Sequence, residues 1–269
     1  MTAYSKATVT PANIHPTAIL DPEAIIPDSC RIGPYCTVGA DVELGEHCEL
    51  MSHVALQGPT RMGSHNRIFP FASVGLPPQD LKFHGERTRL EIGDNNNIRE
   101  FVTIHRGTPG GGGLTRIGSR CLIMAYVHIA HDCIVGDHVI MANAATLAGH
   151  VIVDDWATVG ALCPVHQYVR IGAHAYIGGG SVVTKDVLPF SKTVTPRNTT
   201  AYGLNAVGLE RRGFSKERIR NLHHAFKLLL ASKLNTTQAL EKLKAEGELG
   251  EDVEMLVSFI ESSERGVIK

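Results

Sequence analysis

Aliphatic residues recur at every sixth position over most of the chain. One run covers residues 14–74, a short run covers 92–104, and a third run covers 117–183. A period of six fits neither an α-helix, with 3.6 residues per turn, nor a single half-buried strand, with a period of two. It is typical of short strands joined by turns, in which each strand sends one aliphatic side chain toward a shared axis. Three such hexads make one triangular coil, and stacked coils pair as parallel sheets. The sequence therefore predicts a parallel β-helix.

Glycine often follows the hexad aliphatic residue, as at Gly33, Gly45 and Gly136. We expect glycine there because a turn that needs an unusual φ favours it.

All six cysteines occupy the same place in the repeat, four residues after a hexad aliphatic residue. Elsewhere that place carries small apolar residues such as Ala72 and Val54. We therefore expect the cysteines to fill the prism interior as small apolar side chains. No CxxC pair is present, which argues against a zinc or disulfide set. The six residues are Cys30, Cys36, Cys48, Cys121, Cys133 and Cys163.

Two segments interrupt the repeat and predict loops that leave the prism. Residues 75–91 place Asp80 and Glu86 where aliphatic residues are expected. Residues 107–114 form a Gly-rich loop. We do not expect it to bind phosphate, because it does not lie between a strand and a helix as phosphate-binding glycine loops do. Loops that leave a rigid repeat structure are common places for ligand contacts.

The pattern becomes helical from about residue 203. Ser215 is expected to cap a helix with one apolar face, a second helix is expected from Thr236 or Thr237, and a third near 250–263. This helical part could cap the last open coil against edge pairing.

These patterns divide the chain into two domains. We expect a parallel β-helix over residues 1–190, with excursion loops at 75–91 and 107–114. A linker and a C-terminal α-helical domain occupy residues 191–269.

Composition excludes several classes of function. Lys and Arg number 26 against 27 Asp and Glu, a net charge of −1, so no basic field is available for nucleic acid. No apolar run approaches the roughly 18 residues that a membrane-spanning helix needs, which argues against stable membrane insertion. Residues 1–7 lack the apolar stretch of a secretory signal. We therefore expect a cytoplasmic globular protein.

Several of the 14 histidines fall on one corner of the predicted prism, on three successive coils about 4.8 Å apart. His174 lies on another face, where we expect a solvated turn residue. A convergent histidine cluster can exchange protons near pH 7 or hold a metal ion. Asp132 follows His131 directly, and a carboxylate beside a histidine suits an oriented base. Spacing alone leaves both interpretations open. The cluster consists of His128, His131, His150 and His166.

The chain resembles the UDP-N-acetylglucosamine O-acyltransferases of lipid A biosynthesis well beyond the generic hexapeptide repeat. The resemblance implies a left-handed β-helix, which departs from the usual right-handed crossover, and a homotrimer with active sites between subunits. The segments that carry it are QDLK (79–82), IGDNNNIREFVTIHRGT (92–108), HIAHDCIVGDHVIMANAATLAGHV (128–151), VHQYVRIGAH (165–174) and GLNAVGLERRGFS (203–215).

The resemblance implies transfer of an (R)-3-hydroxyacyl chain from acyl carrier protein to the glucosamine 3-hydroxyl of UDP-N-acetylglucosamine, the first step of lipid A biosynthesis. His131 would be the general base, and Asp132 could orient its imidazole. The Gly149 N–H would stabilise the oxyanion, a role typically worth a factor of roughly 10²–10³ in rate.

The resemblance also implies a set of substrate contacts. Two arginines suit a diphosphate because they are permanent cations with planar donor forks. Lys82 could instead meet the acidic carrier protein or its phosphopantetheine. No cofactor and no metal are implied, since the acyl donor arrives on the phosphopantetheine of acyl carrier protein. The implied contacts are Gln79, Asp80, Lys82, His105, His128, His150, His166, Gln167, Asn205, Arg211 and Arg212.

In this family, residues on the coils beyond the catalytic one limit acyl length. The matching position is Gly179, and a glycine there leaves room for a longer chain. The chain length itself, and a 3-amino rather than a 3-hydroxy sugar acceptor, stay open.

Three other functions are weighed against this one. A zinc-dependent trimeric β-helix lyase of the carbonic anhydrase type would use the histidine corner as a metal site. The sister N-acyltransferase of the same pathway carries an additional N-terminal domain, for which coils that begin by Ile14 leave no room. A non-catalytic β-helix scaffold is disfavoured by the histidine corner.

Overall fold

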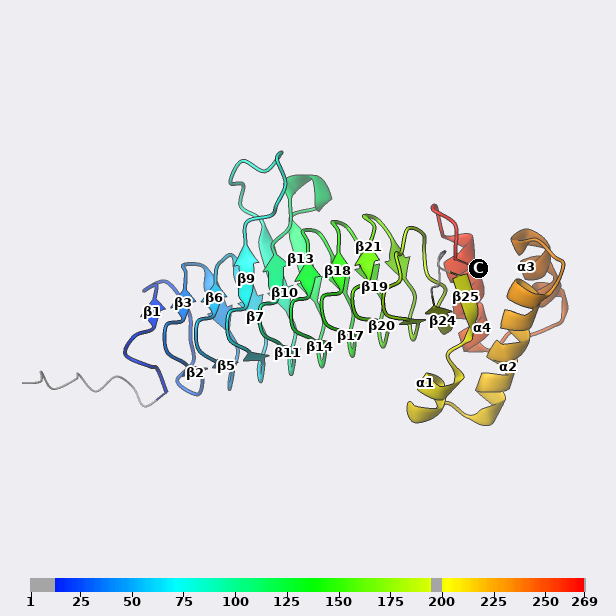
Figure 1. Ribbon diagram of the computed structural model, residues 1–269, viewed down its shortest axis with the longest axis horizontal. Coiled ribbons are helices and arrows are strands. Elements are labelled where there is room, and N and C mark those ends of the chain that lie inside the picture. The colour runs from blue at the N-terminus through cyan, green and yellow to red at the C-terminus, as the bar shows by residue number, and fades with distance from the viewer. Residues whose placement is uncertain (1–12, 195–199, 269) are drawn as a thin grey trace, which may run out of the picture.

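Three parallel sheets form a triangular prism, with an α-helical region at its C-terminal end (Figure 1). The computed structural model describes residues 13–194 and 200–268; the N-terminal segment 1–7 and linker residues 195–199 considered above lie outside these ranges. The fold is the left-handed parallel β-helix of hexapeptide repeats with C-terminal helices that the sequence predicts.

Each coil contributes one short strand to each sheet. The eight-stranded sheet contains β1 (Ile19–Leu20), β3 (Thr37–Val38), β6 (Ala55–Leu56), β9 (Ser73–Leu76), β12 (Thr103–His105), β15 (His128–Ile129), β18 (Thr146–Leu147) and β21 (Pro164–Val165). The seven-stranded sheet contains β4 (Val42–Leu44), β7 (Thr60–Met62), β10 (Arg89–Ile92), β13 (Leu114–Ile117), β16 (Ile134–Val135), β19 (Ile152–Val153) and β22 (Arg170–Ile171). The ten-stranded sheet contains β2 (Arg31–Ile32), β5 (Glu49–Leu50), β8 (Arg67–Ile68), β11 (Asn97–Ile98), β14 (Leu122–Ile123), β17 (Ile140–Met141), β20 (Thr158–Val159), β23 (Tyr176–Ile177), β24 (Ser191–Val194) and β25 (Thr200–Leu204).

The hexad aliphatic residues pair in register from coil to coil and fill the prism. Ile129 pairs with Leu147, which pairs with Val165, and all three are buried. The six cysteines are buried and carry free thiols, which confirms their prediction as small interior side chains. Burial of this continuous aliphatic column stabilises the fold by about 25 cal/mol for each Å² of apolar surface removed from water.

The prediction that glycine serves an unusual φ is wrong for the glycines that follow the hexad aliphatic residue. Left-handed φ occurs instead two residues later, at non-glycine residues such as His47 (φ 58°). Glycine is needed because the next coil lies too close: a Cβ added to Gly45 would come within 2.6 Å of the Gly63 carbonyl carbon. The spacing of stacked coils, and not turn geometry, selects glycine here.

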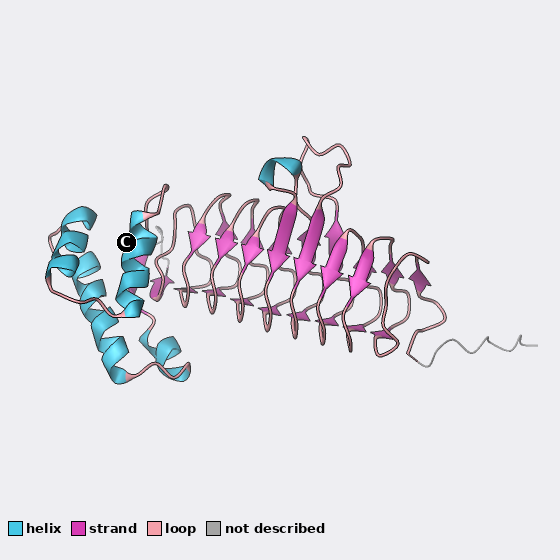
Figure 2. Ribbon diagram, turned by 180° about the vertical axis from the view of Figure 1, so that it is seen from behind, coloured by secondary structure: helices cyan, strands magenta, loops and turns pink. Residues whose placement is uncertain are grey.

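The two predicted excursions leave the same edge of the prism (Figure 2). The first leaves after β9 and returns at β10, and the second carries a short 3₁₀ turn, η1 (Pro109–Gly111), before β13. Both connect the eight-stranded sheet to the seven-stranded sheet. They therefore stand at the corner where the predicted histidine cluster begins.

The C-terminal region is helical, as predicted. It contains α1 (Ala206–Arg211), α2 (Lys216–Phe226), the π-helical turn η2 (Lys227–Ala231), α3 (Thr236–Ala245) and α4 (Glu251–Glu261). Ser215 caps α2 as expected, since its side chain accepts the Arg218 N–H at 3.2 Å. The cap of α3 is Asn235, in a capping box with Gln238. None of the helices in these described segments is long and apolar enough to cross a bilayer.

The helical region packs on the open end of the prism. Leu188 and Phe190, at the end of the last coil, join the apolar core of the helices. Asp186 accepts a hydrogen bond from Ser263 at 2.8 Å, and Arg170 donates to the Ser262 carbonyl at 3.2 Å. The last parallel strand, β24, is covered by antiparallel β25. Together these contacts protect the edge of the final coil from pairing with another chain.

Candidate active site

His131 and Asp132 lie in the turn between β15 and β16, at the corner from which the excursions leave. The Nδ1 atom of His131 is 2.7 Å from Oδ2 of Asp132. The Asp132 side chain is 1% exposed, whereas that of His131 is 17% exposed. The carboxylate thus favours the proton on Nδ1 and leaves Nε2 as the basic nitrogen. This is the geometry of an oriented general base.

Gly149 lies one coil further on, beside the His131 ring. A Cβ added to Gly149 would come within 2.6 Å of Cε1 and 2.9 Å of Nε2 of His131. Within residues 13–194 and 200–268, the Gly149 N–H has no hydrogen-bond acceptor. An unengaged N–H beside the basic nitrogen is suited to receive the oxyanion of an acyl-transfer intermediate.

Three further imidazoles surround His131. The ring of His150 lies edge-on to that of His131, with centroids 5.2 Å apart, and the rings of His105 and His128 are 5.1 Å apart. Burial, assisted by His128 and His131, lowers the pKa of His105 to about 4. Burial also lowers the pKa values of His128 and His150. These three rings are therefore neutral near pH 7 and offer hydrogen bonds rather than charge.

His166 and Gln167 lie on the same corner, one coil beyond His150. Both are exposed, and Arg265 approaches His166 Nδ1 at 3.3 Å. Tyr168 follows them, and its ring stacks on His150 at 4.4 Å between centroids. The structure thus extends the corner by one coil, but the His166 ring is not in contact with His131.

The first excursion brings a predicted acidic contact toward this corner. Asp80 is close enough to His150 that its charge raises the pKa of that ring, against the larger lowering by burial. Lys82 is exposed and donates its backbone N–H to Asp80 Oδ1 at 2.9 Å. Gln79 is also exposed. Arg106 holds the base of the excursion through the Gly75 carbonyl at 3.1 Å.

The remaining predicted contacts lie elsewhere, beside the ten-stranded sheet. A cavity of about 560 Å³ is lined by Tyr176, Asn205, Arg211 and Arg212 together with neighbouring residues of α1 and the sheet. Arg211 is exposed, whereas Asn205 is buried. The structure therefore places the predicted substrate residues in two groups, on different parts of one chain.

The expectation of a solvated turn at His174 is wrong. Its ring stacks on Phe190 at 5.5 Å between centroids, and Arg212 approaches its Nδ1 at 3.2 Å. Burial, assisted by the charge of Arg212, lowers the pKa of His174 to about 4. The Arg212 guanidinium also lies over the Trp156 ring at 5.5 Å. Sequence spacing gave no sign of the Arg212 contact, because Arg212 follows α1 and lies outside the repeat.

Gly179 lies near the C-terminal end of the prism and is exposed. A Cβ there would approach the Ala161 carbonyl oxygen at 3.2 Å, so a side chain fits after a small shift.

Among residues 13–194 and 200–268, one side-chain set could hold a metal ion. Ligand atoms of His131, Asp132 and His150 lie within 4.8 Å of one another. However, Asp132 Oδ2 already accepts hydrogen bonds from His131 and from the Thr108 hydroxyl, at 2.7 and 2.5 Å. A metal would have to displace these bonds, whereas an oriented base uses them as they stand.

Thr108 is a residue of this network that spacing did not single out. It lies in the second loop, 24 residues before Asp132, and only the fold brings them together. The sequence signal available was its place in the segment 92–108 that carries the family resemblance.

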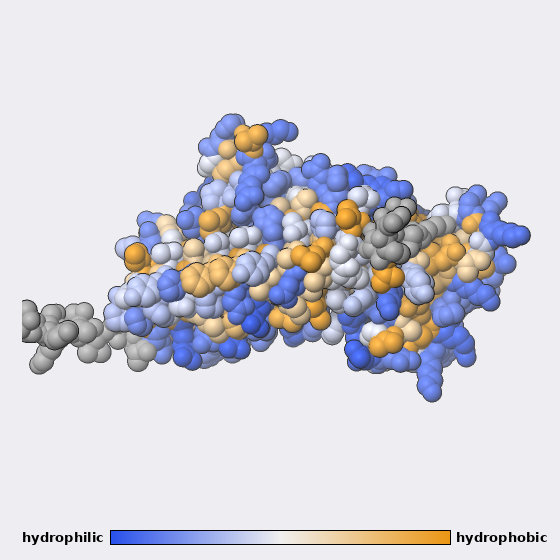
Figure 3. Space-filling model, in the orientation of Figure 1, coloured by the Kyte–Doolittle hydropathy of each residue, from blue (hydrophilic) through white to orange (hydrophobic). Residues whose placement is uncertain are grey.

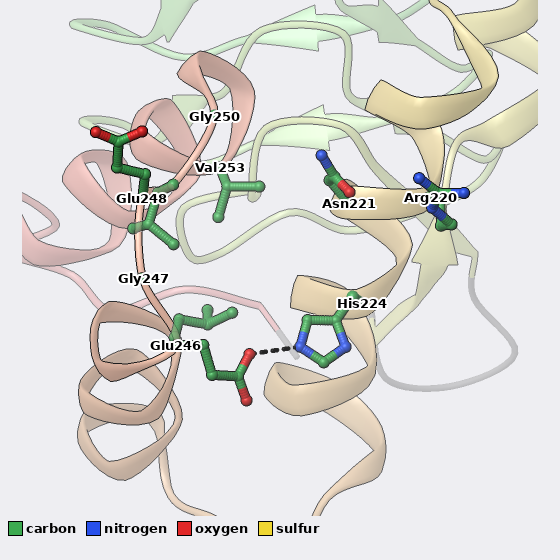
Figure 4. A pocket seen from close by; sticks show the side chains of 10 residues that line it. Arg220, Asn221, His224, Glu246, Gly247, Glu248, Gly250 and Val253 are labelled. Carbon is green, nitrogen blue, oxygen red and sulfur yellow. Dashed lines mark hydrogen bonds and ion pairs between the residues drawn. The ribbon is translucent and has the colours of Figure 1, made fainter.

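A separate cavity of about 430 Å³ lies among the C-terminal helices (Figure 4). His224 and Glu246 line it and are in contact with each other, with Nε2 and Oε2 2.6 Å apart. It contains none of the predicted site residues.

Two family models match the chain. Residues 186–268 match a model described as Udp N-acetylglucosamine O-acyltransferase, Domain 2. Residues 114–149 match the bacterial transferase hexapeptide model of six repeats.

Curated relatives carry one activity in their names. An acyl-[acyl-carrier-protein]--UDP-N-acetylglucosamine O-acyltransferase of Myxococcus xanthus is 52% identical over 212 residues, which cover 79% of this chain and 82% of the relative. The enzyme of the same name from Xanthomonas oryzae pv. oryzae is 48% identical over 256 residues, which cover 95% and 97%. These names lend no support to the zinc lyase alternative.

Solved structures agree with the fold. UDP-N-acetylglucosamine acyltransferase of Francisella novicida superposes with a TM-score of 0.92 at 39% identity, covering 95% of this chain and 93% of that one. UDP-N-acetylglucosamine O-acyltransferase of Moraxella catarrhalis gives a TM-score of 0.91 at 44% identity, covering 96% and 100%.

Proposed function

This chain belongs to the UDP-N-acetylglucosamine O-acyltransferase family, and from that premise we propose the reaction it catalyses. It transfers an (R)-3-hydroxyacyl chain from acyl carrier protein to the glucosamine 3-hydroxyl of UDP-N-acetylglucosamine, in the first step of lipid A biosynthesis. The observation that carries this proposal is the placement of a carboxylate-oriented imidazole directly beside an unengaged backbone N–H, at His131 and Gly149.

The chemistry follows from these two groups. Nε2 of His131 removes the proton from the sugar hydroxyl as its oxygen attacks the thioester carbonyl. The Gly149 N–H donates to the oxyanion of the tetrahedral intermediate. When the C–S bond breaks, the imidazolium returns the proton to the departing phosphopantetheine sulfur. Asp132 keeps the Nδ1 proton in place and stabilises the imidazolium between these steps.

Neutral histidines bind the substrates around this centre. His105, His128 and His150 offer ring nitrogens without adding charge that would disfavour the imidazolium of His131. Gln79, Asp80 and Lys82 approach the sugar from the first excursion. His166 and Gln167 continue the contact surface along the corner.

The nucleotide binds the second group of residues, which supports a homotrimer. Arg211 and Arg212 hold the diphosphate, and Asn205 the adjoining part of the nucleotide. These residues lie beside the ten-stranded sheet, whereas His131 lies where the other two sheets meet. One substrate reaches both groups when the corner of one copy faces the cavity of the next.

Exposed aromatic rings also support association of copies. Tyr35, His53, Phe71, Phe101 and Tyr126 form a row on the corner between the ten-stranded and eight-stranded sheets, with successive centroids 4.9–5.0 Å apart. Figure 3 shows apolar surface along the prism. A row of exposed aromatic side chains of this kind is typical of protein–protein contacts.

Mass spectrometry of the sugar product tests the reaction. Purified protein is mixed with UDP-N-acetylglucosamine and carrier protein loaded with 3-hydroxyacyl chains of several lengths, with and without a chelator. We expect an acylated UDP-sugar that is insensitive to the chelator, because we propose no metal cofactor. Absence of the adduct, together with bound zinc in elemental analysis, would contradict the proposal. We also propose that the protein is located in the cytoplasm, where acyl carrier protein can supply the acyl chain.

Mixing variants tests whether the site is shared between copies. At a UDP-sugar concentration below the wild-type KM, co-expressed His131→Ala and Arg211→Ala chains should be more active than either variant alone, since some sites combine an intact His131 with an intact Arg211. Failure to restore activity in mixed oligomers would place both residues in a site within one chain.

A further inference from the structure

Thr108 donates two hydrogen bonds to the carboxylate that orients His131. Its backbone N–H lies 2.8 Å from Asp132 Oδ1, and its hydroxyl lies 2.5 Å from Oδ2. Thr108 and Asp132 are both buried, so water does not compete for these bonds. Oδ2 is the same oxygen that faces His131 Nδ1, at 2.7 Å. The three residues thus form one hydrogen-bonded chain from the Gly-rich loop to the imidazole.

The Gly-rich loop is shaped to close over this carboxylate. A Cβ added to Gly111 would lie 2.0 Å from Asp132 Cγ, and one added to Gly107 would lie 2.8 Å from Oδ1. Any side chain at these positions would displace either the loop or the carboxylate. The glycines therefore allow the loop to seat Thr108 against Asp132.

Another threonine holds the backbone of Asp132 but not its carboxylate. Thr115 Oγ1 accepts the Asp132 N–H at 2.8 Å, in a turn where Asp132 adopts a φ of 60°. The two threonines thus have different roles: Thr115 holds the backbone of the turn at Asp132, and Thr108 holds the Asp132 carboxylate.

We propose that Thr108 is a positioning residue that sets the basicity of His131 through Asp132. This inference rests on the proposed function, in which His131 is the general base. The Thr108 hydroxyl and the His131 N–H both donate to Oδ2 of Asp132. The hydrogen bond from either donor therefore weakens the hydrogen bond that Oδ2 accepts from the other. With both donors present, Oδ2 accepts two hydrogen bonds, His131 keeps its proton on Nδ1, and Nε2 is left as the nitrogen that accepts the substrate proton.

Thr108→Val removes the hydroxyl while it keeps the backbone N–H and the side-chain shape. On the acidic limb of the pH profile we expect kcat to fall by about 3- to 10-fold, because more of the His131 imidazole is then protonated, with KM for the UDP-sugar within about twofold. The acidic limb of the kcat profile should move up by about half to one pH unit, because the carboxylate then holds the imidazolium more strongly. Thr108→Ser keeps the hydroxyl and should restore kcat and the acidic limb.

Two matched variants separate positioning from structural support. Thr115→Val removes the contact with the Asp132 backbone, and we expect it to lower the melting temperature without moving the acidic limb. Thr37→Val, at an exposed position of β3 that lies four strands before β15 in the eight-stranded sheet, should change neither the melting temperature nor the acidic limb. The proposal is overturned if Thr108→Val leaves the pH profile unchanged, or if Thr115→Val moves it equally.

A readout that needs no turnover keeps this test apart from the proposed function. In protein labelled with ¹⁵N-histidine, the His131 signals are identified by their loss in His131→Ala. We expect Nδ1 protonated and Nε2 unprotonated in the wild type, with a higher titration midpoint in Thr108→Val. An unchanged midpoint overturns the role of Thr108 even if acyl transfer is confirmed, and a raised midpoint supports it even if the reaction proves different. If Thr108→Val does not fold, the Thr108→Ser midpoint decides, since it must match the wild type.

Discussion

Gly149 lies so close to the imidazole of His131 that a single methyl group on its Cα would come within 2.6 Å of Cε1. A main-chain N–H can approach the basic nitrogen in this way because no side chain stands between them. The proposed base and the proposed oxyanion donor are therefore held together by the stacking of two adjacent coils.

Gly149→Ala should disrupt catalysis more than folding. The added Cβ would displace the His131 ring or the Gly149 backbone, so we expect kcat to fall by about 100-fold. Gly110→Ala is the matched control, because a Cβ there meets nothing within 4 Å. A lower kcat in Gly149→Ala than in Gly110→Ala, at equal melting temperatures of the two variants, would support this account. Equal kcat values for the two variants would contradict it.

Arg211 and Arg212 should differ when each is replaced by alanine. Both losses should raise KM for UDP-N-acetylglucosamine, by about tenfold or more, because each removes a charged donor to the diphosphate. Arg212→Ala should also lower the melting temperature, since Arg212 contacts His174 and Trp156, whereas exposed Arg211 should not. An unchanged KM in Arg211→Ala would remove that residue from the nucleotide site.

Gly179→Met should shorten the preferred acyl chain. The backbone accepts a Cβ there with a small shift, so the longer side chain occupies space rather than unfolding the coil. Competition among carrier proteins loaded with different chains, read by mass spectrometry, measures the preference. If the variant still prefers the longest donor, the residue that limits acyl length lies elsewhere.

Acid should destabilise the protein partly through His105, whose pKa is lowered to about 4 by burial. Its pKa in the unfolded chain is about 6.5. As the pH falls from about 6.5 to 4, the unfolded state binds a proton that the folded state does not. The free energy of unfolding therefore decreases, by up to about 1.4 kcal/mol per pH unit for this group.

His105→Gln should remove that contribution to the slope. Denaturant unfolding at several pH values between 4.5 and 7 compares the variant with the wild type. Parallel curves for the two proteins would show that His105 does not remain neutral in the folded state.

Sequence periodicity was sufficient to predict the prism because stacked coils impose a register that few other folds share. The hexad residues, the buried cysteines and the existence of two excursions all follow from it, although the strands β9 and β10 extend into the range 75–91 predicted for the first excursion. The same register brought His131 and His150 to one corner. The domain boundary at residue 190 stays a prediction.

Contacts made by segments outside the repeat could not be predicted in this way. Thr108 meets Asp132 only because a Gly-rich loop folds back by a path that the repeat does not encode. His174 is enclosed by residues that follow the prism in sequence, such as Arg212. The roles assigned to single residues come from the family resemblance and remain proposals.

The most direct test of the central claim is acyl transfer by His131→Ala. We expect kcat to fall by at least about 100-fold, because general-base catalysis typically contributes 10²- to 10⁴-fold. Light scattering should give the same oligomer mass as the wild type, three times that of the chain. Full transfer activity in an intact His131→Ala oligomer would contradict the assignment of His131 as the base.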